Sequence, residues 1–170
     1  EEHLSACISS EIPITGINAE VMPGQWEFQV GGPGVDPLTG SDCLWVARWL
    51  LYRIGEKYNI SATLEPKPVT GDWNGAGMHI NFSTEATRSE GGLAVIEEIM
   101  STMGNRISEH LSEYGDGYEI RLTGKHETCR YDEFKWGVSD RTASVRIPIT
   151  TARDKKGYFE DRRPNANADP

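Results

Sequence analysis

Short segments in which apolar and polar residues alternate, separated by glycine and proline, constrain the fold of this chain more than any other feature. These segments are residues 25–30, 78–83 and 142–147. A period of two is typical of β-strands that bury one face and expose the other. The alternation therefore predicts several short strands, each with one apolar and one polar face.

Two longer segments carry apolar residues at helical spacing. In the first, they recur every three or four positions between an N-cap at Ser41 or Asp42 and a C-cap at Asn59. In the second, the same spacing runs from Leu93 to Leu111. Both segments predict amphipathic helices that pack on a sheet. Groups of strands interrupted by two long helices favour an α+β fold, in which helices cover one face of a largely antiparallel sheet.

The chain is acidic, which argues against several classes of function. Its 170 residues include 17 Lys and Arg against 26 Asp and Glu, a formal net charge of −9, so we expect neither nucleic-acid binding nor attachment to a membrane surface. No apolar run approaches the roughly 18 residues that a membrane-spanning helix needs, which predicts a soluble protein. The three cysteines form no CxxC pair, so the sequence predicts neither a disulfide framework nor a zinc ribbon and favours a reducing compartment.

Two glutamates flank a turn signal near the N-terminus. Glu20 and Glu27 lie on either side of Met22-Pro23-Gly24, a sequence that favours a tight connection. Carboxylates that converge repel one another unless a cation lies between them, and a divalent cation with oxygen ligands would satisfy both. The alternative is a pair of solvated glutamates.

His79 is a further candidate ligand. It follows residues 72–77, where two glycines allow the backbone to approach a ligand closely. An imidazole among carboxylates suits Mg2+ or Mn2+ better than a closed tetrahedral zinc site. A histidine with a purely structural role is the alternative.

Arginines are concentrated in the last third of the chain, within otherwise acidic sequence. A guanidinium group binds phosphate or carboxylate through two hydrogen bonds and stays charged, so arginines near metal-binding carboxylates point to phosphoryl transfer. Surface salt bridges are the alternative. The chain has no GxxxxGK[ST] or GxGxxG motif, so a nucleotide would be held by metal ions and arginines. The arginines in question are Arg121, Arg141, Arg146, Arg162 and Arg163.

Several motifs follow one another along the chain in an order that is itself informative. They are NAEVMPGQWEFQV at 18–30, PKP at 66–68, NGAGMH at 74–79 with NFST at 81–84, LTGKHET at 122–128, RTASVRIP at 141–148 and GYFEDRRP at 157–164. Together they resemble the motifs of glutamine synthetase of the eukaryotic type, essentially from residue 1 to residue 170.

The resemblance implies ATP-dependent synthesis of glutamine from glutamate and ammonia through γ-glutamyl phosphate, with two divalent ions, Mg2+ or Mn2+. It implies that the metal ligands are Glu20 and Glu27 for one ion, and His79 and Glu160 for the other. It implies glutamate contacts from Asn74, Gly75, Arg121 and Arg162, and ATP contacts from Asn81, Ser83, Arg146 and Tyr158. Arg141 matches the arginine that stabilises the transferring phosphoryl group. Glu127 matches the glutamate of a mobile flap that shields the acyl phosphate from water.

The resemblance also sets expectations for the whole protein. Residues 1–170 match part of the catalytic domain, truncated at both ends and lacking the small N-terminal domain, so we expect this stretch alone to be inactive. The family's catalytic domain is a curved, largely antiparallel sheet with helices on its outer face. We expect a cytoplasmic homo-oligomer of stacked rings, a decamer with active sites shared between subunits, although organellar targeting stays open. The alternatives are a ligase that joins glutamate to an organic amine and a non-catalytic structural relative.

Overall fold

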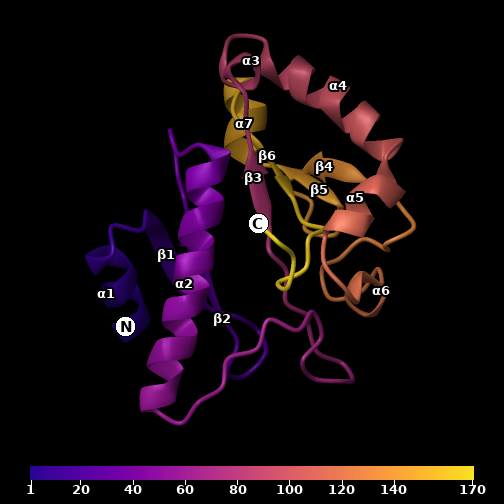
Figure 1. Cartoon of the computed structure of the whole chain (residues 1–170). Helices are drawn as coiled ribbons and strands as arrows, with labels where there is room; N and C mark the ends of the chain where they lie inside the picture. Colours follow the sequence, from indigo (N-terminus) through magenta and orange to yellow (C-terminus); the bar gives the residue numbers. More distant parts are fainter. The chain divides into compact units, whose positions relative to one another are not determined.

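The chain divides into two units, residues 1–63 with Pro170 and residues 64–169. The structure is a computed structural model and describes all residues from 1 to 170 (Figure 1). Each unit has its own helices, strands and buried cluster of apolar side chains. None of the helices is both long enough and apolar enough to cross a membrane.

The first unit is built on a β-hairpin. Strands β1 (Ile14–Ala19) and β2 (Trp26–Val30) pair antiparallel, with Asn18 opposite Glu27. The backbone N–H of Gln25 donates to the Met22 carbonyl at 3.0 Å and closes the turn. The strand predicted at 25–30 and the tight connection before it are confirmed, whereas no pattern singled out β1.

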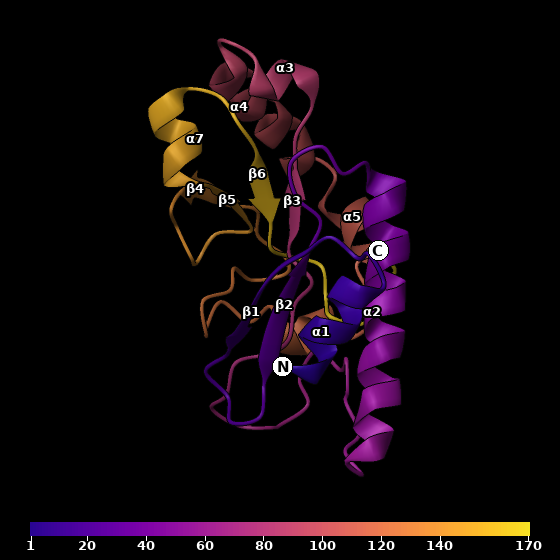
Figure 2. The same ribbon diagram turned by 90° about the vertical axis from the view of Figure 1, so that its left-hand side faces the viewer.

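Two helices accompany the hairpin. They are α1 (Glu2–Ser9) and α2 (Pro37–Lys57), and Figure 2 shows both beside β1 and β2. Cys7 of α1 and Ala47 of α2 are fully buried in one cluster, against which Phe28 of β2 packs. Ala47 of the predicted apolar stripe of α2 is thus buried, whereas the other α2 residues that pack against this cluster are Cys43 and Leu50.

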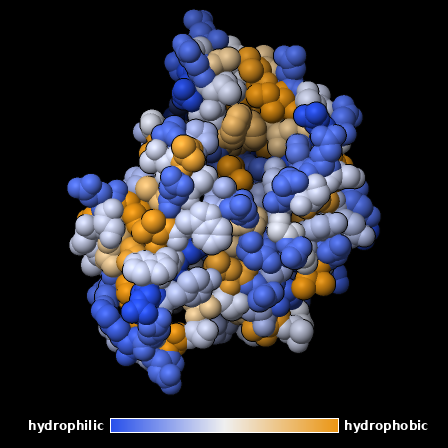
Figure 3. All heavy atoms as spheres, in the orientation of Figure 1, coloured by the Kyte–Doolittle hydropathy of each residue, from blue (hydrophilic) through white to orange (hydrophobic).

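The start predicted for α2 was wrong. The helix begins at Pro37, because the Asp36 side chain accepts a hydrogen bond from the Thr39 backbone N–H at 3.1 Å and so caps the helix several residues before Ser41. On its outward face α2 leaves Leu38, Trp45 and Trp49 exposed. Apolar and hydrophilic side chains lie next to one another over the surface drawn in Figure 3.

The second unit contains a four-stranded sheet in the order β3-β6-β5-β4. Two of its pairs are antiparallel, and β4 runs parallel to β5. The strands predicted at 78–83 and 142–147 are confirmed, although each has a core of only three residues. The bounds are β3 (Ile80–Phe82), β4 (Trp136–Val138), β5 (Val145–Ile147) and β6 (Phe159–Asp161).

One helix, α4 (Gly92–Gly104), packs on this sheet. Ile96 and Met100 of α4 are fully buried against Val145, Ile147 and Phe159, which confirms the predicted packing of an amphipathic helix on a sheet (Figure 1). The single helix predicted from Leu93 to Leu111 is in fact two helices, separated at Asn105 and Arg106. The helices of this unit are α3 (Glu85–Arg88), α4 (Gly92–Gly104), α5 (Ile107–Glu113), α6 (Tyr118–Arg121) and α7 (Ile149–Asp154). The fold is therefore α+β, as predicted.

Candidate active site

Glu127 and Arg141, the two residues to which the sequence motifs assign catalytic roles, meet in the second unit. Arg141 Nη2 lies 2.8 Å from Glu127 Oε2. Glu127 belongs to the loop between α6 and β4, and Arg141 to the connection between β4 and β5. The guanidinium of Arg162 donates a hydrogen bond to the Arg141 carbonyl. Three predicted site residues from three motifs are thus brought together.

The loop that carries Glu127 has a defined backbone shape. Thr123 and Arg130 form an isolated antiparallel bridge at its base, and the Thr128 N–H donates to the Lys125 carbonyl at 3.2 Å. His126 and Glu127 have φ angles of 53° and 61°. Non-glycine residues rarely adopt this left-handed conformation, which persists only where surrounding contacts impose it. The mobility predicted for the loop stays a prediction.

A row of polar residues crosses the sheet. Asn81 of β3 and Arg146 of β5 both lie opposite Glu160 of β6, which is buried between them. Glu160 Oε1 is 2.9 Å from His79 Nδ1, and the Arg146 Nε donates to Glu160 Oε2 at 2.5 Å. A predicted pair of metal ligands is therefore adjacent to two residues predicted to contact ATP.

The electrostatics of this row favour an ionised Glu160. Burial raises the pKa of its carboxyl group, but the hydrogen bond and charge of His79, together with the charge of Arg146, outweigh burial and leave that pKa below its ordinary value. A carboxylate that stays ionised is what a divalent cation requires of a ligand.

Arg121 lies in the interior. Its side chain is almost fully buried, and its guanidinium donates to the carbonyls of Arg162 and Arg163 at 2.8 and 2.9 Å. Burial, followed by the charge of Arg162, lowers the pKa of Arg121 to about 10. The structure thus shows Arg121 supporting the backbone at 162–163, and its contact with glutamate stays a prediction.

One cleft of the second unit is lined both by two predicted glutamate-binding residues and by the loop that carries Glu127. It has a volume of about 380 Å³. Gly75 and Arg121 lie on one part of its wall, and Lys125 and His126 of the loop lie on another. Lys67 and Asp72 also line it, so cationic groups outnumber carboxylates. Such a lining suits an anionic ligand.

The other residues predicted to bind ATP or glutamate have structural contacts of their own. The Ser83 hydroxyl accepts a hydrogen bond from Arg88 Nη1 at 2.8 Å, and the Tyr158 carbonyl accepts one from the Thr151 hydroxyl at 3.0 Å. The Tyr158 ring is part-exposed, with 39% of the residue accessible. Asn74 lies in the segment that leads to β3. Their ligand contacts stay predictions.

Glu20 and Glu27 lie in the first unit, at the turn end of the hairpin. Glu20 Oε1 accepts from the Asn18 amide at 2.9 Å, and Glu27 Oε1 accepts from the Gln29 amide at 2.6 Å. Their oxygens are of the class that Mg2+ and Mn2+ prefer, as are those of Glu160. No group of three or more His, Cys, Asp or Glu side chains forms a potential metal site anywhere in residues 1–170. The predicted ligand pairs therefore fit metal binding by chemical class, but each supplies only part of a coordination shell.

A buried polar network in the second unit was not predicted. The Asp161 carboxylate accepts from Arg163 Nε and Nη2 at 2.9 and 2.6 Å, and from the Tyr114 hydroxyl at 2.8 Å. Arg163 Nη2 also lies 3.0 Å from His110 Nδ1. Arg163, one of the clustered arginines, thus forms its ion pair with the buried carboxylate of Asp161. Tyr114 and Asp161 are 47 positions apart in sequence, and His110 and Arg163 are 53 positions apart, so local patterns could not reveal these two contacts.

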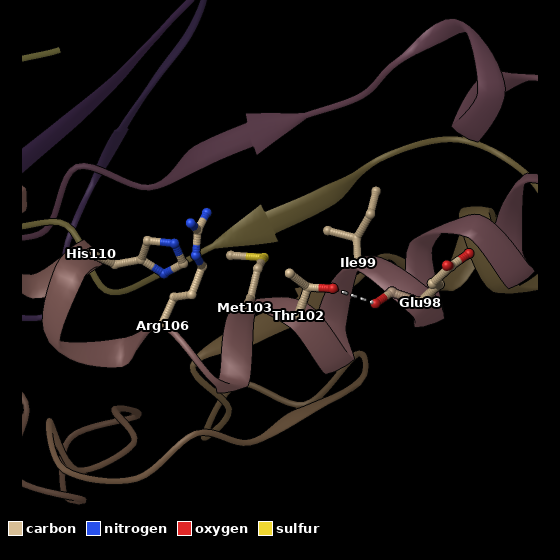
Figure 4. Close-up of a pocket in the computed structure, with 6 residues that line it drawn as sticks. All are labelled: Glu98, Ile99, Thr102, Met103, Arg106 and His110. Atoms are coloured by element: carbon tan, nitrogen blue, oxygen red, sulfur yellow. Dashed lines mark hydrogen bonds between the residues drawn. The ribbon is translucent and has the colours of Figure 1, made fainter.

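His110 also lines a second cleft, of about 290 Å³, on α4 and α5. Figure 4 shows Arg106 and His110 at one end of it and Glu98 at the other. None of the residues predicted to bind substrate or metal lines this cleft.

The comparisons with known proteins agree on one family. Residues 1–170 match the family model described as glutamine synthetase, catalytic domain. A glutamine synthetase of Streptomyces viridochromogenes is 56% identical over 170 residues, and one of Emericella nidulans is 52% identical over 173 residues. A chloroplastic glutamine synthetase of Chlamydomonas reinhardtii is 53% identical over 171 residues. All three alignments cover 100% of this chain but 49%, 47% and 44% of the respective relatives, so the chain spans about half the length of the curated relatives it matches.

Proposed function

The chain belongs to the glutamine synthetase family through its catalytic domain, and we propose that the complete protein ligates ammonia to L-glutamate, giving L-glutamine, ADP and phosphate from ATP. The observation that carries the proposal is the pairing of Glu127 with Arg141 across 2.8 Å. The reaction needs a cationic group that stabilises the transferring phosphoryl group, which the guanidinium of Arg141 supplies. It also needs a group that protects the acyl phosphate from water, which the adjacent carboxylate of Glu127 supplies.

The reaction proceeds in two steps under this proposal. The side-chain carboxylate of glutamate attacks the terminal phosphorus of ATP, and γ-glutamyl phosphate and ADP form. Arg141 places its guanidinium on the transferring phosphoryl group, where negative charge develops. Ammonia then attacks the acyl carbon, and phosphate leaves. Glu127 accepts a proton from the attacking nitrogen and excludes water from the intermediate.

The remaining site residues divide between the substrates. Glutamate is held by Asn74, Gly75, Arg121 and Arg162, and ATP by Asn81, Ser83, Arg146 and Tyr158. His79 and Glu160 would hold one Mg2+ or Mn2+ ion, and Glu20 and Glu27 another, with further ligands from parts of the protein outside these 170 residues. When bound, such ions neutralise phosphate charge and orient the reacting groups.

The proposal extends to the assembly. The sheet of residues 64–169 is proposed to be part of a larger curved sheet with helices on its outer face. The complete chain is proposed to form a decamer of stacked rings with shared active sites. Cytoplasmic location stays a prediction, since the relatives include a chloroplastic form.

An amine panel tests the proposed function. The complete protein is assayed with ATP, Mg2+, glutamate and either ammonia or a series of primary amines, and both phosphate and the amide product are measured. Glutamine formed in step with phosphate, with ammonia preferred, supports the proposal. Preference for an organic amine would identify a γ-glutamyl-amine ligase instead. Absence of product with every amine would identify a non-catalytic relative.

A further inference from the structure

We propose that His126 is a positioning residue, and that its contact with Asp72 holds the flap segment, residues 123–130, in the conformation that keeps the Glu127 carboxylate on Arg141. The inference rests on the proposed function, because it assigns a purpose to the Glu127–Arg141 pair. It adds a contact to which neither the motifs nor the comparisons give a role.

Two neighbouring residues connect the flap segment to different parts of the unit. His126 Nε2 lies 3.3 Å from Asp72 Oδ1, while Glu127 Oε2 lies 2.8 Å from Arg141 Nη2. Asp72 precedes the segment that leads to β3, and Arg141 lies between β4 and β5. The tip of the flap segment is therefore held from two sides.

The backbone of the flap segment makes these contacts interdependent. His126 and Glu127 are consecutive non-glycine residues with left-handed φ angles of 53° and 61°. That conformation is unfavourable for both, so the contacts of their side chains and the hydrogen bonds from Thr128 to the Lys125 carbonyl together compensate. If the contact between His126 and Asp72 is lost, the peptide group between His126 and Glu127 can rotate. The orientation of the Glu127 side chain then changes.

The contact between His126 and Asp72 also lies beside the residues proposed to bind glutamate. Asp72 and His126 both line the cleft of about 380 Å³ that contains Gly75 and Arg121. The Asp72 side chain is 99% exposed and that of His126 is 28% exposed, so the pair can open without unpacking the core. An exposed pair of this kind is weak, which suits a segment that must release its substrate and close again.

Substitutions in the complete protein test the proposal. Asp72→Ala removes the carboxylate, and His126→Asn shortens the side chain while retaining a residue that tolerates the left-handed region. Asp154→Ala is the matched control, because it removes an exposed carboxylate paired with Arg153 on α7. Two quantities are measured: phosphate released per glutamine formed, and hydrogen exchange at the amides of residues 124–128.

We expect both test variants to raise the phosphate-to-glutamine ratio and the local exchange rate about two- to fivefold, the range that a weak exposed pair allows. The double variant should be no worse than either single variant, because both remove one contact. Asp154→Ala should change neither quantity. The proposal would be overturned if hydrogen exchange at residues 124–128 did not change in the test variants. It would also be overturned if that exchange became faster while the phosphate-to-glutamine ratio stayed the same, or if exchange became faster throughout residues 64–169. Wild-type protein that makes no glutamine would overturn the proposed function, and the exchange measurement would still decide whether Asp72 holds the flap segment.

Discussion

The guanidinium of Arg121 lies against the backbone of Gly77 so closely that a Cβ atom at position 77 would come within 2.2 Å of Arg121 Nη2. Arg121 cannot move aside easily, because it donates to the carbonyls of Arg162 and Arg163 and to the Asn165 side chain. Gly77 in turn forms an isolated antiparallel bridge with Asn165. The glycine is therefore required by close approach, and the arginine joins the segments that flank β3 and β6.

Gly77→Ala should destabilise the second unit. Because the new methyl group must displace a buried, hydrogen-bonded guanidinium, we expect a loss of about 1–3 kcal/mol in the free energy of unfolding, the usual range for overpacking. Gly40→Ala is the control, since the nearest atom to its Cβ would be Val35 Cγ1 at 3.8 Å and the residue lies in α2; it should be neutral or stabilising. Denaturant unfolding of the complete protein measures both, and equal stability of the two variants would contradict the close-contact argument.

The sequence predicted those elements whose two faces differ in polarity. β2, β3 and β5 alternate, and the apolar stripe of α4 contains Ile96 and Met100, so these elements could be predicted. The expected buried face is confirmed in β5 and α4, but not in β3, whose Ile80 and Phe82 are exposed. β6 was missed because its sequence, Phe159-Glu160-Asp161, has two consecutive charged residues and no alternation, although all three residues are buried. The break between α4 and α5 was missed because the apolar spacing continues across it. α4 ends at Gly104, which packs so closely on Phe134 that a Cβ atom at position 104 would lie 3.1 Å from the Phe134 ring. Such tertiary contacts leave no local pattern.

The roles assigned to the candidate site residues stay predictions, and the contacts between these residues could not be predicted from the sequence. Motifs identified Glu127, Arg141 and Glu160, yet only the fold shows that Arg141 contacts Glu127 and that Arg146 lies opposite Glu160. Arg121 was counted among arginines available to a ligand. Its burial depends on carbonyl groups about 40 residues further along the chain, and separation in sequence carries no information about such a contact.

Tyr114 should resist ionisation at alkaline pH. Burial, and then the charge of Asp161 and the hydrogen bond to it, raise the pKa of Tyr114 well above the ordinary value of 10. Between these two pKa values the unfolded chain releases this proton and the folded chain retains it, so the contribution of Tyr114 to stability falls as pH rises above about 10. Below that pH the residue is neutral in both states and the contribution is fully present.

Tyr114→Phe makes this dependence measurable. The variant should be less stable than the wild type at about pH 8, because it loses a hydrogen bond worth on the order of 1 kcal/mol, and the difference should narrow as pH approaches about 11. Unfolding midpoints at several pH values record the trend. Tyr52→Phe, at an exposed position on α2, is the control and should parallel the wild type. A difference that widens with pH would contradict the assignment.

Arg141→Ala should reduce turnover much more than it weakens glutamate binding. A group that meets developing phosphoryl charge acts mainly in the transition state, so we expect kcat of the complete enzyme to fall on the order of 100-fold or more, with a small change in the KM for glutamate. Arg141→Lys retains the positive charge but cannot form the two parallel hydrogen bonds of a guanidinium, so it should recover only part of the wild-type kcat. An unchanged kcat with a raised KM would make Arg141 a binding group for the ground-state carboxylate.

Glu127→Ala should separate phosphate release from amide formation. Without the carboxylate, water can reach the acyl phosphate, so ATP should be consumed in the presence of glutamate without an equivalent yield of glutamine. Glu127→Gln separates the two roles of this residue, because the amide still fills the position but cannot accept a proton. Glu127→Gln should give a ratio of phosphate to glutamine closer to one than Glu127→Ala does, while the rates at which phosphate and glutamine form both fall. Phosphate and glutamine are measured in parallel, with and without ammonia. If Glu127→Ala lowers both products in strict proportion, Glu127 does not shield the intermediate, and its contact with Arg141 serves only to orient the arginine.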